Sequence, residues 1–274
     1  MLMRETVPVT SAESHRVNWD PQIYDRFDRE RTRPFVDLIS QVLAPSPTRV
    51  IDLGCGTGST TAMLARRWPD AEVLGIDSSS QMLAKARSML DLPANLHFEL
   101  MDISAWMPEP GVEVIVTNAA LQWVPDSTAL MLQWFTSMDR GAWFAMQVPH
   151  SAQLPSHVLL NRLVHSDRWR DVLGEGIRAG GTVVPPAEYL ELMLASGMDA
   201  QVWETEYLHA LNGEEPVLDW VRGTSLRPVI AKLSADDAEL FEQQYSALLR
   251  EAYPRSAFGT LYPFKRIFAV GHKR

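Results

Sequence analysis

A glycine-rich turn is the segment of this sequence best suited to chemistry. The run VIDLGCGTG spans Val50–Gly58 and places Gly54, Gly56 and Gly58 at alternate positions, directly after an apolar stretch. Glycine lets the backbone turn tightly and lets a ligand approach where a Cβ would block it. A helix that follows such a turn presents free N–H groups and a positive dipole end. We therefore predict a strand, a ligand-binding loop and a helix here.

The acidic residue before this turn, Asp52, disfavours a ligand with a pyrophosphate group. Asp52 would lie close to a pyrophosphate and repel it. The third glycine also stands one position earlier than in the dinucleotide-binding pattern, which would have glycine in place of Ser59. A carboxylate here suits a cationic ligand, such as one with an ammonium and a sulfonium group. An NAD-dependent oxidoreductase is the alternative, and both features disfavour it.

Polar residues recur where the next strands should end. Asp77 ends the second apolar run, where a carboxylate can accept both hydroxyls of a ribose. Asp102 ends the third run, where it could accept from an adenine amino group with Ile103 beside the ring, and Asn118 ends the fourth. Any one of them could be a helix cap. Because ligands bind at the carboxyl ends of the strands in open α/β sheets, we predict one binding edge.

The spacing of short β-branched runs predicts an α/β fold with a doubly wound, mostly parallel sheet. The runs are separated by stretches that fit one helix each, as in strand–helix–strand crossovers. The predicted strands are Arg49–Leu53, Glu72–Ile76, Leu96–Leu100, Glu113–Thr117 and Ala142–Val148, and the predicted helices are Ser59–Trp68, Ser78–Leu90 and Asp126–Met138.

The regular alternation of strands and helices ends after the fifth predicted strand. Further strands are predicted at Gln201–His209 and Phe264–Gly271, and the gaps before them hold helices at Ser156–Val172, Pro186–Ser196, Val217–Ile230 and Ala235–Ala252. We predict one domain over residues 1–274, with a core at about 45–150 plus the two late strands. Insertions at about 151–200 and 212–255 should form a helical cap. A separate C-terminal domain is the alternative.

The motifs resemble those of the class I S-adenosylmethionine-dependent methyltransferases. The resemblance rests on VIDLGCGTG, on Asp77 and on MDI at Met101–Ile103. It implies a Rossmann-like sheet of seven strands whose last strand is antiparallel, and S-adenosylmethionine as the cofactor. The cofactor-binding residues it implies are Asp52, Gly54, Gly56, Gly58, Asp77, Ser78, Met82, Asp102, Ile103, Asn118 and Ala119.

Four longer stretches resemble the trans-aconitate 2-methyltransferases, which esterify a small tricarboxylic acid. They are WDPQIYDRFDRERTRPFVDL (Trp19–Leu38), NAALQWVPD (Asn118–Asp126), WVRGTSLRPVI (Trp220–Ile230) and LYPFKRIFAV (Leu261–Val270). The second stretch is also similar to methyltransferases that act on malonyl-carrier protein, which remain an alternative. Within the first stretch we predict cofactor contacts from Trp19 and Tyr24, as an aromatic lid, and from Arg33, which could reach the carboxylate of the cofactor's methionine portion. An ordinary amphipathic helix face is the alternative for the two aromatic residues.

A carboxylate acceptor needs no general base, because it is already a nucleophile at neutral pH. We therefore predict no acid–base catalyst and no metal ligand; His150, His157 and His165 lack metal-ligand spacing. Arginine forks suit the carboxylates that do not react. The predicted substrate-binding residues are Arg222, Arg227, Arg31, Lys265, Gln122 and Trp123, with Arg33 and Arg266 as further basic candidates.

The composition disfavours several partners. The net charge of −9 gives no general attraction to nucleic acid or to an anionic membrane, and no apolar run is long enough to span a bilayer. The single cysteine, Cys55, excludes an intrachain disulfide, and no export signal is visible, so we expect a cytoplasmic protein. A nucleic-acid methyltransferase and a non-catalytic binding module are the remaining alternatives. The oligomeric state stays open.

Overall fold

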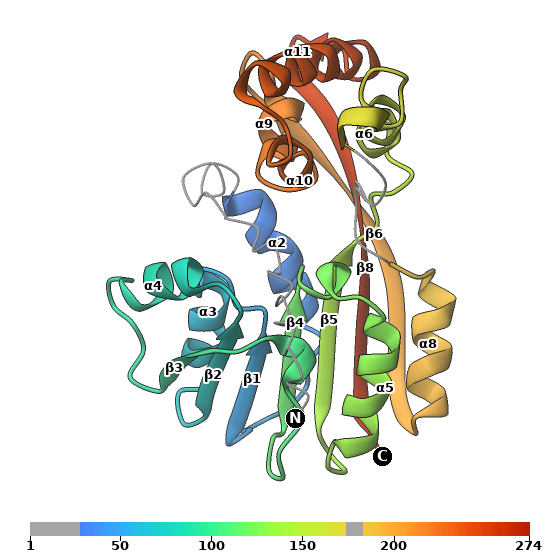
Figure 1. Cartoon of the computed structure of the whole chain (residues 1–274). Helices are drawn as coiled ribbons and strands as arrows, with labels where there is room; N and C mark the ends of the chain where they lie inside the picture. Colours follow the sequence, from blue (N-terminus) through green and yellow to red (C-terminus); the bar gives the residue numbers. More distant parts are fainter. Residues whose placement is uncertain (1–27, 174–182) are drawn as a thin grey trace, which may run out of the picture.

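A twisted sheet runs through the whole molecule in the computed structural model, which describes residues 28–173 and 183–274. Its strand order is β3-β2-β1-β4-β5-β8-β6, and the short β7 pairs with β8 beside this path (Figure 1). The first five strands are mutually parallel, whereas β8 runs antiparallel to both β5 and β6. The predicted doubly wound sheet with an antiparallel last strand is confirmed.

The parallel half consists of short strands. They are β1 (Arg49–Leu53), β2 (Glu72–Asp77), β3 (Leu96–Leu100), β4 (Val114–Asn118) and β5 (Trp143–Pro149). Of these, β1, β4 and β5 are mostly buried and the edge strand β3 is largely exposed. Their side chains alternate between two apolar cores, as the period of a strand requires. Val114 and Val116 pack into one core, and Ile115 packs into the other.

Helices cover both faces of this half. On one face, α2 (Asp28–Ile39) contributes Phe35 and α3 (Ser59–Arg67) contributes Leu64 to the core. On the other face, α5 (Ser127–Ser137) contributes Trp134 and α8 (Pro186–Ala195) contributes Tyr189. The helix α4 (Ser80–Arg87) and the 3-10 turns η1 (Ile103–Ala105) and η2 (Leu121–Trp123) complete the connections. The ends of β1 to β4 are thereby held at one edge.

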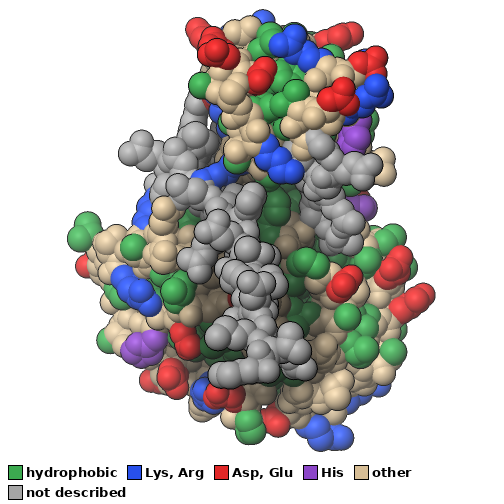
Figure 2. Space-filling view, viewed as in Figure 1, with side chains coloured by type: hydrophobic (Ala, Val, Ile, Leu, Met, Phe, Trp, Pro, Cys, Tyr) green, Lys and Arg blue, Asp and Glu red, His purple; other side chains and the backbone are tan. Residues whose placement is uncertain are grey.

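The cap is a cluster of helices at the end of two long strands. β6 (Met198–Leu211) and β8 (Gly259–Lys273) stay paired and extend together beyond the parallel strands (Figure 1). The helices of the cap are α6 (Pro155–Val164), α7 (Arg170–Leu173), α9 (Pro216–Arg222), α10 (Arg227–Ile230) and α11 (Ala235–Ala252). The connection from α11 to β8 contains β7 (Arg255–Ser256). The cap has its own core, which includes Trp169, Phe241 and Tyr245. Acidic and basic side chains are interspersed over its outer surface (Figure 2).

The predicted cap boundary was wrong at one helix. Helix α8 falls within the predicted cap range of 151–200, but Tyr189 and Met193 pack into the sheet core together with Trp134. It therefore covers the sheet beside α5 instead of joining the cap (Figure 1). Among the described residues, no helix is both long and apolar enough to cross a membrane.

Candidate active site

The three glycines of the turn have different roles. All have positive φ, at 81° for Gly54, 56° for Gly56 and 77° for Gly58. A Cβ on Gly54 would lie 2.3 Å from the Cβ of Ala120, and one on Gly58 would lie 2.6 Å from Cζ of Phe98. A Cβ on Gly56 would meet no atom of the described residues within 4 Å. Packing therefore requires two of the glycines, and Gly56 alone faces open space.

Asp77 joins this turn to the end of β2. Its Oδ2 accepts from the backbone N–H of Gly56 at 2.8 Å, and its Oδ1 accepts from the N–H of Ser79 at 2.8 Å. Burial raises the pKa of this carboxyl, and the two backbone hydrogen bonds oppose that shift. A carboxylate has about four acceptor positions, so two remain for hydroxyls of a ribose. The predicted juxtaposition of Asp77 with the glycine turn is present.

Asp52 does not face a ligand in this structure. Its side chain is 1% exposed, and its Oδ2 accepts from the Thr61 hydroxyl at 2.6 Å. Burial raises the pKa of Asp52 to about 7. Asp52 thus bonds to Thr61 of α3, and its predicted contact with a cationic ligand stays a prediction.

Asp102 caps a local turn. Its Oδ1 accepts from the N–H of Ser104 at 2.8 Å and from the Ser104 hydroxyl at 2.7 Å, while Ile103 is buried. The oxygen that does not accept stays available for an amino group. Ser78 is exposed after β2, and it is Ser79 that caps α4 by accepting from the N–H of Met82 at 3.3 Å.

A cavity of about 330 Å³ separates the sheet edge from the cap. Its lining comes from the ends of β4 and β5, from η2, from the segment after β5, and from α6, α9 and β8. Its polar lining includes Asn118, Gln122, Ser151, His157 and Arg266. Trp123 also lines the cavity and is 41% exposed.

Arg266 is the buried cation of this cavity. It is 5% exposed, although it lies on β8, and its Nη1 donates to Oε1 of Gln147 at 3.0 Å. Its guanidinium lies 4.8 Å from the centre of the Phe264 ring. A guanidinium only donates, so this bond also fixes the orientation of the Gln147 amide. The arrangement holds a positive fork within a largely desolvated wall.

Acceptors lie at the floor of the cavity, where β4 ends. The Nε2 of Gln122 donates to the carbonyl of Ala119 at 2.7 Å. Oδ1 of Asn118 and Oε1 of Gln122 are buried and have no hydrogen-bond partner among the described residues. Ala119 itself has φ 54°, a conformation that non-glycine residues rarely adopt. Strained backbone and orphaned buried oxygens at one strand end are typical of a ligand site.

The structure gives Arg222 a different role from the predicted anion clamp. Its Nη2 lies 2.7 Å from Glu242, and its Nη1 lies 2.8 Å from Asp219. These carboxylates raise the pKa of Arg222 and occupy both sides of its fork. Arg222 therefore ties α9 to α11 within the cap and does not line the cavity.

The other predicted basic residues are dispersed. Arg227 lies on α10 outside the cavity lining, and Lys265 lies 3.2 Å from Glu204. Arg33 on α2 is 75% exposed and 3.8 Å from Asp37. Trp19, Tyr24 and the side chain of Arg31 lie outside the described residues.

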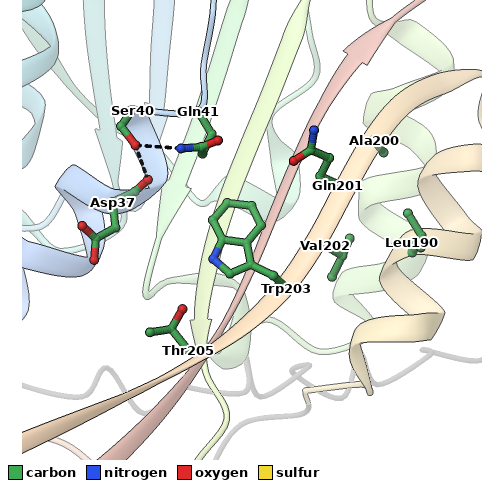
Figure 3. A pocket seen from close by; sticks show the side chains of 9 residues that line it. All are labelled: Asp37, Ser40, Gln41, Leu190, Ala200, Gln201, Val202, Trp203 and Thr205. Carbon is green, nitrogen blue, oxygen red and sulfur yellow. Dashed lines mark hydrogen bonds between the residues drawn. The ribbon is translucent and has the colours of Figure 1, made fainter.

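A second, larger hollow shares no lining residue with the cavity under the cap. It measures about 710 Å³ and runs between α2 and β6, where Asp37, Ser40 and Gln41 face Trp203 and Thr205 (Figure 3). None of the predicted site residues lines it. The described residues contain no group of three or more His, Cys, Asp or Glu side chains that could hold a metal ion. The candidate site is therefore the cavity under the cap together with the adjoining glycine turn.

Comparisons with known proteins show the family and the fold. The model of the methyltransferase domain family matches residues 45–174. Solved structures with the same fold include the YcgJ protein from Bacillus subtilis, with 17% identity, a TM-score of 0.57, and coverage of 89% of this chain and 99% of that one. Another is phosphoethanolamine N-methyltransferase 2 from Haemonchus contortus, with 16% identity, a TM-score of 0.53, and coverage of 88% and 53%.

Curated relatives are much more similar in sequence. The trans-aconitate 2-methyltransferase of Streptomyces avermitilis is 47% identical, over 93% of this chain and 97% of that relative. Those of Rhodococcus jostii and Mycobacterium tuberculosis are 45% and 41% identical, over 92% of this chain and 98% and 95% of the relatives. The chain belongs to the trans-aconitate 2-methyltransferase family, within the S-adenosylmethionine-dependent methyltransferases.

Proposed function

We propose that this protein methylates one carboxylate of a small polycarboxylic acid, trans-aconitate, and releases a monomethyl ester. The observation that carries the proposal is the buried Arg266 in a cavity at the carboxyl edge of the sheet. The names of relatives that are 41–47% identical over nearly the whole chain support the same substrate.

The residues at the sheet edge fit S-adenosylmethionine. Gly56 leaves space that a Cβ would fill, Asp77 has acceptor positions for ribose hydroxyls, and Asn118 has an orphaned acceptor oxygen. Asp102 and Ile103 follow β3, the strand next to β2, and we assign them to the adenine. When bound, S-adenosylmethionine supplies an electrophilic methyl group. The chain must hold the acceptor carboxylate in line with it.

The protein's contribution to the reaction is positioning and desolvation. Arg266 binds a carboxylate that does not react, because a strong contact to the attacking oxygen would lower its reactivity. The cap covers the cavity, and this limits hydration of the attacking carboxylate. No described side chain is needed as a base, since the acceptor is already ionised.

Turnover with labelled S-adenosylmethionine tests the proposal. The panel contains trans-aconitate, other di- and tricarboxylates, a neutral triester and malonyl-carrier protein. Methylation of trans-aconitate without methylation of the triester is expected, because the triester has no free carboxylate. Methylation of the carrier protein alone would replace the substrate assignment and leave the enzyme class unchanged.

A further inference from the structure

A chain of buried polar groups leads from the core of the cap to the cavity wall. The Tyr262 hydroxyl lies 3.1 Å from Oγ of Ser156, which lies 3.2 Å from Nδ1 of His157. Nε2 of His157 lies 3.0 Å from Oγ of Ser151. Tyr262 and Ser156 are 0% exposed, and His157 and Ser151 line the cavity. The four side chains form one continuous relay.

The number of hydrogens in this relay determines its direction. Burial lowers the pKa of His157 to about 4, so the ring is neutral near pH 7 and carries one N–H. In the first possible arrangement, Tyr262 donates to Ser156, Ser156 donates to Nδ1 of His157, and Nε2–H donates to Ser151. In the second, every bond is reversed, and the hydroxyl hydrogen of Tyr262 points away from Ser156. In the third, Ser156 accepts from both Tyr262 and Nδ1–H, which leaves the buried Ser156 hydroxyl hydrogen without an acceptor among the described residues and is unfavourable.

Burial of Tyr262 favours the first direction. Within the described part of the chain, Ser156 is the one group in hydrogen-bond contact with the Tyr262 hydroxyl. The reversed relay would bury that hydroxyl hydrogen without an acceptor, which is unfavourable. In the first direction every buried hydrogen is used, and the hydroxyl hydrogen of Ser151 is left for the cavity. The relay thus fixes the orientation of the Ser151 hydroxyl, which offers its hydrogen to the cavity.

We propose that Ser151 donates this hydrogen to a carboxylate of the substrate and, with Arg266, determines which acid the cavity accepts. The inference rests on the proposed function. Ser151 follows β5 and Arg266 lies on β8, so the two anion-binding groups come from different elements. A tricarboxylate can place one carboxylate on each and still present a third to the methyl donor. A dicarboxylate can use only one of the two groups.

Steady-state kinetics of Ser151→Ala test this selectivity. For the tricarboxylate that the wild type methylates, KM should rise about tenfold, the loss expected for one hydrogen bond to a charged group, while kcat stays within about twofold. For a dicarboxylate that the wild type also methylates, KM should rise by less than about threefold. An equal KM for the tricarboxylate in variant and wild type overturns the inference.

Two tyrosine variants test the relay itself. Tyr262→Phe removes the first donor and should raise KM for the tricarboxylate in the same direction as Ser151→Ala. Because both changes act on one contact, the double variant should have the KM of Ser151→Ala alone. Tyr253→Phe is the matched control, since the Tyr253 hydroxyl accepts from the backbone N–H of the same Ser156 at 3.0 Å but is outside the relay. Its KM should equal that of the wild type.

The outcomes separate the two proposals. A multiplicative KM effect of Tyr262→Phe and Ser151→Ala would show independent structural damage and overturn the relay. If the wild type methylates a small acid and Ser151→Ala changes no KM, the function stands and the inference falls. If the wild type neither methylates any small acid nor binds propane-1,2,3-tricarboxylate in calorimetry with S-adenosylhomocysteine present, both fall.

Discussion

At the scale of single residues, burial distinguishes the arginines that could bind an anionic substrate. Arg266 lines the cavity, is 5% exposed and donates to the Gln147 amide, whereas Arg222 lies outside the cavity lining and is paired with Asp219 and Glu242. A desolvated guanidinium binds a carboxylate far more strongly than one at the surface. Charge and sequence position alone do not reveal this difference.

Arg266→Met should mainly weaken binding of the acid. We expect a loss of about 2–5 kcal/mol in substrate binding, measured as a higher KM, with the Kd of S-adenosylhomocysteine unchanged. Arg222→Met is the matched control. It should lower the unfolding free energy by about 1 kcal/mol, because the ion pairs it breaks are partly exposed, and leave KM unchanged. The opposite pattern of KM values would assign the clamp to Arg222.

Asp77→Asn should weaken cofactor binding. The substitution removes the negative charge and one acceptor oxygen from the group that joins Gly56 and Ser79. We expect S-adenosylhomocysteine to bind about 1–3 kcal/mol more weakly in calorimetry, with an unchanged circular dichroism spectrum. Wild-type affinity in a folded variant would show that Asp77 only supports the turn.

The polar residues at the strand ends were predictable from the sequence, as were Gln122, Trp123 and Arg266 in the cavity lining, whereas Ser151 and His157 were not. Asp77, Asp102 and Asn118 lie together because the ends of parallel strands meet at one edge, which strand spacing alone implies. Ser151 and His157 carry no such signal. Their place in the cavity depends on how a cap built from distant segments closes over β5, and no local pattern encodes that contact.

At the scale of elements, one turn combines a packing function with a binding function. Gly54 and Gly58 are required because Ala120 and Phe98 lie against them, while Gly56 faces open space. The glycine spacing indicated the turn but could not separate these roles, since the neighbouring atoms come from the residue before η2 and from β3.

Gly56→Ala and Gly58→Ala should therefore differ. The first introduces left-handed strain of about 1–2 kcal/mol but no clash, and should lower the affinity for S-adenosylhomocysteine at least about tenfold. The second places a Cβ 2.6 Å from Phe98 and should cost about 2–4 kcal/mol of stability. Thermal unfolding and calorimetry on both variants check this. Equal losses of affinity would refute the division of roles.

The late strands show where strand prediction fails. The predicted ranges 201–209 and 264–271 became Met198–Leu211 and Gly259–Lys273. Each strand passes from the sheet core into the cap core. On β8, Ile267 packs in the sheet core and Tyr262 packs in the cap core. The apolar pattern changes at that crossing, so a search for one buried run finds only the part within the sheet.

At the scale of the whole molecule, two buried groups with opposite pKa shifts lie in different parts of the fold. Asp52 lies under the glycine turn with its pKa raised to about 7, and His157 lies in the cap with its pKa lowered to about 4, both because of burial. Each makes the stability of the ligand-free protein depend on pH. As pH rises, one group lowers the folding stability and the other raises it.

The two contributions should nearly cancel between about pH 4 and pH 6.5. Folded Asp52 holds a proton that the unfolded chain has released, so this group costs about 1.4 kcal/mol of stability per unit as pH rises through that window. Unfolded His157 holds a proton that the folded chain lacks, so this group adds about 1.4 kcal/mol per unit over the same window. The wild-type contribution from the pair is therefore flat.

A variant that removes one of the two groups should show the pH dependence that the other group gives to the unfolding free energy. The unfolding free energy of Asp52→Asn, from urea titrations, should rise by about 3 kcal/mol relative to wild type from pH 4 to pH 6.5, because only the His157 term remains. His157→Gln should show the reverse slope of similar size, because only the Asp52 term remains. The double variant should again follow the wild type. If each single variant ran parallel to the wild type across this range, neither group would be titrating as its burial requires, and the balance of the two would be disproved.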